Sequence, residues 1–179
     1  MNNYPLILKM MEYYAGRPKQ IQHFMKVYAY AKLIGEMEHI SPELQRILET
    51  AAITHDIGIR ASEIKYGNSS GKNQELEGPP EARKMLWELG YDEELIQRVC
   101  YLIGHHHTYQ KIDGIDYQIL VEADFLVNLY ENGNDSQAVK TALERIFVTE
   151  TGKTLCRTMF GIQEPQIDKK GEISYGTRN

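Results

Sequence analysis

The chain has 179 residues, of which 42% are hydrophobic and 25% charged, a composition typical of a folded globular protein and not of a disordered chain. We expect a single domain over residues 1–179, because this length is common for one domain. The formal net charge of −5 argues against bulk binding of nucleic acid, which requires a basic surface.

The sequence also predicts a cytoplasmic protein without a membrane segment. Its apolar runs are far shorter than the roughly 20 residues that a membrane-spanning helix needs. The N-terminus lacks the basic start and the long apolar stretch of a signal peptide. The two cysteines, Cys100 and Cys156, have no metal-binding or redox spacing, so we expect a reducing compartment.

Helical periodicity and turn residues predict an all-α bundle of about six to eight helices. Ser41 before Pro42 and Asp92 before Glu93 are good helix caps. In chain order, the clearest helices are expected at residues 5–15, 19–39, 42–56, 79–90, 92–107, 116–130 and 137–148.

Two segments are expected to lie outside these helices. Residues 66–78 (YGNSSGKNQELEG) contain three glycines, two serines and two asparagines, which predicts a long loop that could act as a lid over a site. Residues 163–179 are polar and predict either a frayed tail or a short hairpin near its end.

Four polar side chains fall on helix faces that the pattern assigns to the core. His23 shares its face with Val27 and Ala31, His55 and Asp56 follow a buried run, and Asp124 lies among aliphatic residues. A buried carboxylate needs a partner, a proton or a metal. The four groups could therefore form ordinary His–Asp pairs or share one cation. Their nitrogen and oxygen atoms suit Mn²⁺, Fe²⁺, Co²⁺ or Ni²⁺, and are compatible with Zn²⁺ or Mg²⁺.

The segment AAITHDIG, residues 51–58, resembles the signature of the HD superfamily of metal-dependent phosphohydrolases. In that family a His, a His-Asp doublet and a later Asp bind the metal, and here they match His23, His55, Asp56 and Asp124 in order. Arg17 is similar to a basic residue that often precedes the first His. The resemblance covers residues 17–130, and it implies an all-helical catalytic domain.

Other HD enzymes, including the HD-GYP phosphodiesterases, hold a second metal with additional histidines. The run His105-His106-His107 offers two of these, because His106 and His107 should point inward and His105 toward solvent. Glu77 stands where the remaining His would be. It could bind a second ion, act as the catalytic carboxylate seen in single-metal HD nucleotidases, or only support its helix. Without a second ion, His106 and His107 could donate hydrogen bonds to a phosphate.

The resemblance implies hydrolysis of a small phosphoester, with a nucleotide among the candidates, by a metal-activated water. Asp56 and Glu77 would orient or deprotonate that water, and the phosphate would be bound by cations at Arg17, Arg60, Lys65 and Lys72. Two alternatives stay open: a di-iron HD-type oxygenase and a non-catalytic metal- or nucleotide-binding protein. The expected partner is a small molecule. The oligomeric state is left open, a homodimer included.

Overall fold

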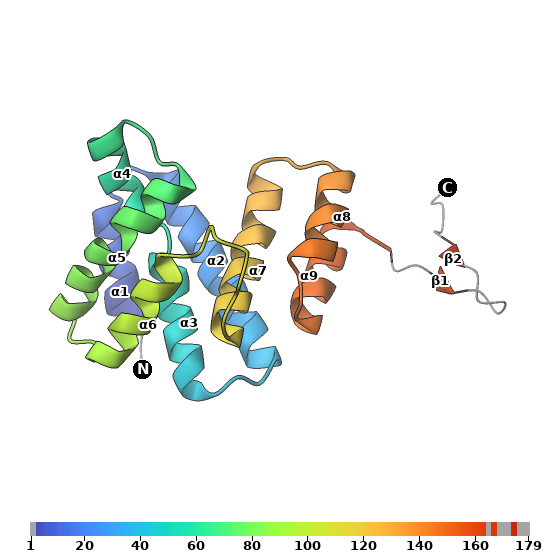
Figure 1. Cartoon of the computed structure of the whole chain (residues 1–179), viewed down its shortest axis with the longest axis horizontal. Coiled ribbons are helices and arrows are strands. Elements are labelled where there is room, and N and C mark those ends of the chain that lie inside the picture. Colours follow the sequence, from blue (N-terminus) through green and yellow to red (C-terminus); the bar gives the residue numbers. More distant parts are fainter. Residues whose placement is uncertain (1–2, 164–165, 168–172, 175–179) are drawn as a thin grey trace.

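The computed structural model describes residues 3–163 and the backbone of residues 166–167 and 173–174. Residues 3–163 are all-α, as expected, and Figure 1 shows their helices in sequence colours. The helices are α1 (Tyr4–Tyr13), α2 (Pro18–Met37), α3 (Pro42–Thr54), α4 (Gly58–Tyr66), α5 (Gly71–Glu88), α6 (Glu93–Ile103), α7 (Ile115–Glu131), α8 (Ser136–Arg145) and α9 (Glu150–Phe160).

Helix α3 is the centre of the bundle and packs against α1, α2, α6 and α7. All of its residues from Ile47 to Thr54 are buried, and the small side chains of Ala51 and Ala52 let neighbouring helices approach closely. Helix α7 packs against both α2 and α3 and is also mostly buried. The carboxyl end of α3 and the middle of α7 are therefore held together inside the core.

Two of the helix starts expected from the sequence are confirmed by their caps. The Ser41 side chain accepts a hydrogen bond from the backbone N–H of Leu44 at 3.2 Å. The Asp92 carboxylate accepts one from the N–H of Leu95 at 2.9 Å. Each cap satisfies a backbone donor that the first turn of a helix leaves free.

The prediction of a long loop at residues 66–78 is wrong, because α5 begins at Gly71 and only residues 67–70 connect it to α4. Pro79 and Pro80, expected at the helix start, lie inside α5. A Cβ atom on Gly58 would lie 2.6 Å from the backbone oxygen of Gln74 and 2.8 Å from the nitrogen of Gly78, so α4 and α5 touch backbone to backbone. We attribute the early start of α5 to this tertiary packing, which outweighs its poor local helix signal.

Nine helices in the described part exceed the expected six to eight. Helix α4 was missed because only Gly58 and Ser62 are buried, which leaves no apolar stripe. Helix α9 was also missed, and the expected helices at 92–107 and 137–148 are too long, since α6 ends at Ile103 and α8 at Arg145. The three histidines therefore lie on a turn after α6.

The short C-terminal hairpin is confirmed in its paired residues. Strands β1 (Gln166–Ile167) and β2 (Ile173–Ser174) are antiparallel, with Gln166 opposite Ser174. The expected fraying of the tail concerns residues 164–165, 168–172 and 175–179, which lie outside the described residues. Within the described residues, no helix combines the length and the apolar character needed to cross a bilayer.

Candidate metal centre

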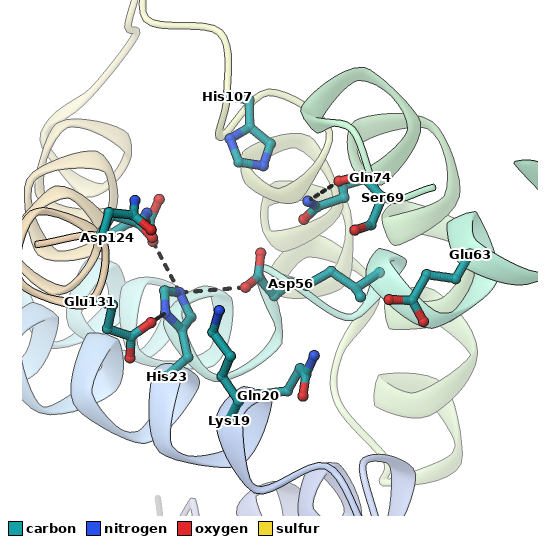
Figure 2. Close-up of a pocket in the computed structure, with 13 residues that line it drawn as sticks. Lys19, Gln20, His23, Asp56, Glu63, Ser69, Gln74, His107, Asp124 and Glu131 are labelled. Atoms are coloured by element: carbon teal, nitrogen blue, oxygen red, sulfur yellow. Dashed lines mark hydrogen bonds and ion pairs between the residues drawn. The ribbon is translucent and has the colours of Figure 1, made fainter. Parts of the chain in front are cut away.

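The four residues predicted from the sequence to be metal ligands lie close together at the base of one pocket. His23 comes from α2, His55 and Asp56 from the turn that joins α3 to α4, and Asp124 from α7. Figure 2 shows His23 between Asp56 and Asp124. His23, His55 and Asp124 are almost fully buried, at 7%, 0% and 3% exposure, so the network lies in the interior and not on a solvated surface.

The donor atoms of these residues are spaced as ligands of one ion would be. Nε2 of His23 lies 3.2 Å from Nε2 of His55, 3.2 Å from Oδ1 of Asp124 and 3.4 Å from Oδ2 of Asp56. Nε2 of His55 lies 3.5 Å from Asp56 and 3.6 Å from Asp124. Metal bonds of about 2.1 Å place neighbouring ligands about 3.0–3.4 Å apart. The residues therefore fit a divalent cation.

The other ring nitrogen of each histidine, Nδ1, is hydrogen-bonded to the protein. This orients Nε2 toward the neighbouring donor atoms. Nδ1 of His55 lies 2.9 Å from the carbonyl oxygen of Ala52 and therefore donates its proton there. Nδ1 of His23 lies 3.0 Å from Glu131, whose other oxygen accepts from Lys26 at 2.6 Å. Such partners fix the tautomer and the orientation of metal-binding histidines.

In the metal-free state the positive imidazoles and the negative carboxylates of the cluster stabilise each other's charged forms. Burial disfavours charging of His55, but Asp56 and Asp124 overcome it and raise the pKa of the imidazole to about 9. In turn, although burial disfavours the charged carboxylates, the neighbouring histidines hold the pKa of Asp56 and of Asp124 well below the usual range. Both carboxylates are therefore ionised at neutral pH and available to a cation.

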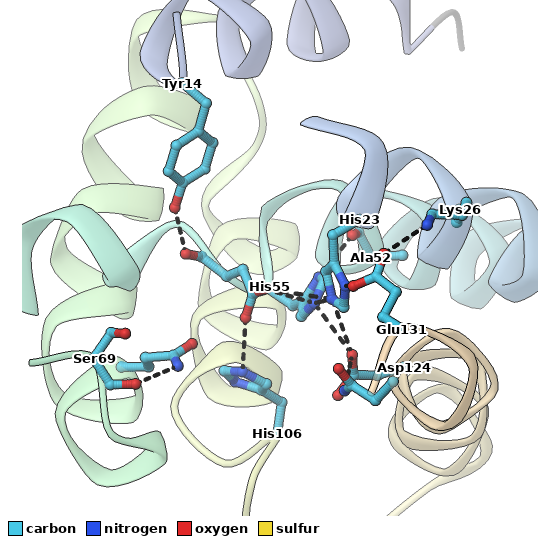
Figure 3. A network of polar contacts seen from close by, with 12 residues as sticks. Tyr14, His23, Lys26, Ala52, His55, Ser69, His106, Asp124 and Glu131 are labelled. Carbon is cyan, nitrogen blue, oxygen red and sulfur yellow. Dashed lines mark hydrogen bonds and ion pairs between the residues drawn. The ribbon is translucent and has the colours of Figure 1, made fainter. Parts of the chain in front are cut away.

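Asp56 also faces a second group of imidazoles, that of His106 and His107. Figure 3 shows one of them, His106, in the same polar network as His23 and His55. Its Oδ1 lies 3.6 Å from Nε2 of His106, and donor atoms of Asp56, His106 and His107 lie within 4.8 Å of one another. Nδ1 of His106 lies 2.7 Å from the carbonyl oxygen of Ile103 and donates its proton there, which leaves Nε2 facing Asp56. Nε2 of His106 and of His107 are buried without a hydrogen-bond partner. Two unpartnered ring nitrogens beside a carboxylate are the donor set of a metal site, and this second group therefore also fits an ion.

Glu77 does not join either group in the structure. Its carboxylate accepts hydrogen bonds from Lys65 at 2.8 Å and from the hydroxyl of Tyr66 at 2.7 Å. The neighbouring Glu75 instead supports the histidine turn, because it accepts from the backbone N–H of His107 at 3.0 Å. The residue of α5 that lines the pocket is Gln74.

The four cations expected to bind phosphate are not among the residues that line the pocket. Arg17 pairs with Glu63 at 2.6 Å, Arg60 donates to the carbonyl oxygen of Tyr13 at 3.0 Å, and Lys72 is exposed on α5. Lys65 is engaged by Glu77, as described above. The cation that does line the pocket is Lys19, one turn before His23 on α2.

The pocket over the centre has a volume of about 250 Å³ and includes polar residues that sequence reasoning missed. Their signal was helical spacing, since Lys19 and Gln20 precede His23 by four and three residues, and Asn128 and Glu131 follow Asp124 by four and seven. Gln74 had no such signal, because residues 66–78 read as a loop. The missed lining residues are Lys19, Gln20, Ile59, Glu63, Ser69, Gln74, Asn128, Glu131 and Asn132.

Comparison with known proteins agrees with this geometry. A family model for the HD domain matches residues 21–143, more than half of the chain and all of the residues of both imidazole groups. No curated protein and no solved structure matches the chain.

Proposed function

The chain belongs to the HD domain family, and from that premise we propose that it is a metal-dependent hydrolase of small phosphoesters. HD domains bind divalent metals and form a superfamily of metal-dependent hydrolases. The observation that carries the proposal is that Nε2 of His23 and Nε2 of His55 lie 3.2 Å apart, and that each lies 3.2–3.6 Å from carboxylate oxygens of Asp56 and Asp124. Mn²⁺, Fe²⁺, Co²⁺ or Ni²⁺ suits this set best.

A divalent ion bound there would lower the pKa of a water molecule and polarise a phosphoryl oxygen. Side chains of the protein position the water molecule and the phosphate. Asp56, ionised and facing both imidazole groups, orients the attacking water through its carboxylate. Lys19 lines the pocket and supplies positive charge to the phosphate. One water is consumed, the ester P–O bond breaks, and the products are an alcohol and inorganic phosphate.

The position of His107 suits it to contact the substrate or a second ion. Burial lowers the pKa of this imidazole to about 4, so it is neutral at pH 7. A neutral ring can donate a hydrogen bond to a phosphate oxygen or offer a lone pair to a metal. Either role uses Nε2, which has no hydrogen-bond partner in the described structure and is buried.

A di-iron oxygenase is the second candidate, and one observation favours it. The two carboxylate oxygens of Asp56 face two different imidazole groups, as a residue between two ions would. Iron near two atoms per chain, with oxygen consumed in proportion to product, would support this candidate. Turnover of phosphoesters without oxygen would support hydrolysis instead.

The test begins with metal analysis of protein purified without chelator, followed by assays of p-nitrophenyl phosphate and bis(p-nitrophenyl) phosphate with Mn²⁺, Co²⁺, Fe²⁺ or Mg²⁺. We expect His55→Ala and Asp56→Ala to lose metal retention and to reduce turnover at least about 100-fold, in line with loss of a group essential to a metal site. His39→Ala is the matched control, because His39 is exposed and outside the pocket. Unchanged turnover in either ligand variant would overturn the proposal.

A further inference from the structure

Gln74 lines the pocket, and its side chain has a buried acceptor without a partner among the described residues. Its side chain is buried, at 8% exposure, and Nε2 donates to the carbonyl oxygen of Ser69 at 2.8 Å. Because that carbonyl oxygen can only accept, the amide nitrogen must face it and Oε1 must face the other way. Oε1 is buried and has no hydrogen-bond partner in the described structure. Figure 2 shows the amide beside Ser69, on the side of the pocket away from His23.

The backbone holds Gln74 at a fixed place relative to Asp56. The close approach of Gly58 to the backbone oxygen of Gln74 sets α5 against the start of α4, two residues after Asp56. About one turn before Gln74 on α5, Gly71 lies against the ring of His107, where a Cβ would meet ring atoms at 2.9 Å. A buried acceptor on such a rigid support is pre-organised to receive a donor from a ligand.

The character of the lining indicates what kind of ligand this is. Among the lining residues that the structure describes there is no Phe, Tyr or Trp ring on which a base could stack, and Lys19 is the one Lys or Arg side chain. Five of the thirteen lining residues carry an amide or a hydroxyl group, namely Gln20, Ser69, Gln74, Asn128 and Asn132, and four carry a carboxylate, namely Asp56, Glu63, Asp124 and Glu131. These groups can accept hydrogen bonds from the hydroxyl groups of a ligand. With a volume of about 250 Å³, the pocket is below the usual range for drug-sized ligands.

We propose that Oε1 of Gln74 accepts a hydrogen bond from a hydroxyl group on the alcohol part of the substrate, and that the enzyme prefers monophosphate esters of small sugars or polyols. This inference rests on the proposed function. It makes Gln74 a specificity residue, since an ester without hydroxyl groups leaves its buried oxygen unpaired. Sites built to bind a hydroxyl group discriminate strongly against analogues that lack it.

The test compares ribose 5-phosphate with pentyl phosphate, which has the same number of carbon atoms and no free hydroxyl group, in metal-loaded protein. We expect kcat/KM to favour ribose 5-phosphate at least tenfold in the wild type, and Gln74→Leu to reduce this ratio about tenfold. Gln97→Leu is the matched control, because Gln97 is exposed on α6 and outside the pocket, and it should keep the wild-type ratio. Circular dichroism and metal content establish that the variant is folded and loaded, and Gln74→Met replaces it if Gln74→Leu does not fold.

The outcomes separate this inference from the function on which it rests. If neither of these esters nor either p-nitrophenyl substrate is hydrolysed with any of the metals, the proposed function fails and the inference fails with it. If only the p-nitrophenyl substrates are hydrolysed, the hydrolase stands and the inference is overturned. If both are hydrolysed with a ratio near one, or if Gln74→Leu keeps the wild-type ratio, the hydrolase stands and the role of Gln74 is overturned. A kcat/KM for adenosine monophosphate ten times that for ribose 5-phosphate would also overturn the preference for sugars or polyols.

Discussion

The carboxylate of Asp56 lies between two imidazole groups, with Oδ1 3.6 Å from Nε2 of His106 and Oδ2 3.4 Å from Nε2 of His23. His106 follows α6, whereas His23 belongs to α2, so one side chain lies between imidazoles from two segments that are distant in the sequence. An acid in this position can serve two ions at once. The number of metal ions per chain is therefore the first quantity to measure.

His106→Ala should lower the metal content of fully loaded protein from two ions per chain to one, because it removes an imidazole from only the second group. His105→Ala should keep both ions, since Nδ1 of His105 lies 2.7 Å from the carbonyl oxygen of Tyr101 and its ring packs on the Tyr101 ring. Elemental analysis of both variants after equilibration with Mn²⁺ checks this. A greater loss of metal in His105→Ala than in His106→Ala would reverse the assignment.

Metal binding at pH 7 should release at least one proton per chain. The pKa of His55 is about 9 and that of His23 is raised above its usual value, so the metal-free cluster is protonated, whereas ligating imidazoles must be neutral. Metal affinity should therefore rise with pH until about pH 9 and then level off. Calorimetric titration in two buffers of different ionisation enthalpy counts the protons. Equal binding heats in both buffers at pH 7 would contradict the expected protonation.

Glu77→Gln should change kcat by less than about threefold, because its carboxylate contacts Lys65 and Tyr66 and not the pocket. A general base contributes on the order of 10²–10⁴-fold to the rate, so kcat distinguishes a catalytic role of Glu77 from a structural one. Steady-state kinetics with p-nitrophenyl phosphate provide the measurement, with the exposed Glu94→Gln as control. A 100-fold loss would restore a catalytic role to Glu77.

Glu122→Gln should lower the free energy of unfolding by about 2–3 kcal/mol, the range for hydrogen bonds to a buried charge. The carboxylate is fully buried and accepts from the backbone N–H of Val148 at 2.6 Å and of Thr149 at 2.9 Å, just before α9. Urea denaturation of metal-free protein measures the change. Glu150→Gln, on an exposed side chain, should stay within about 0.5 kcal/mol. Equal effects would show that Glu122 does not secure α9.

The helices with strong apolar faces and caps were predictable, and those that depend on packing were not. Ser41 and Asp92 identified the starts of α3 and α6 because a cap bonds to a residue three positions away. Helix α4 and the first half of α5 carry few apolar residues. Their stability comes from the contact of Gly58 with Gly78, 20 positions along the chain, which no local pattern reveals.

The amino-acid sequence by itself determined that imidazoles and carboxylates would be buried on three separate helical segments, because helical periodicity assigns His23, His55 and Asp124 to apolar faces. Only the tertiary structure decided which oxygen of Asp56 faces which histidine, that Lys19 and not Arg17 lines the pocket, and that Gln74 takes the place expected for Glu77. The physical reason is that periodicity fixes the direction of a side chain around its own helix. The rotation and the separation of neighbouring helices depend on contacts between residues distant in sequence.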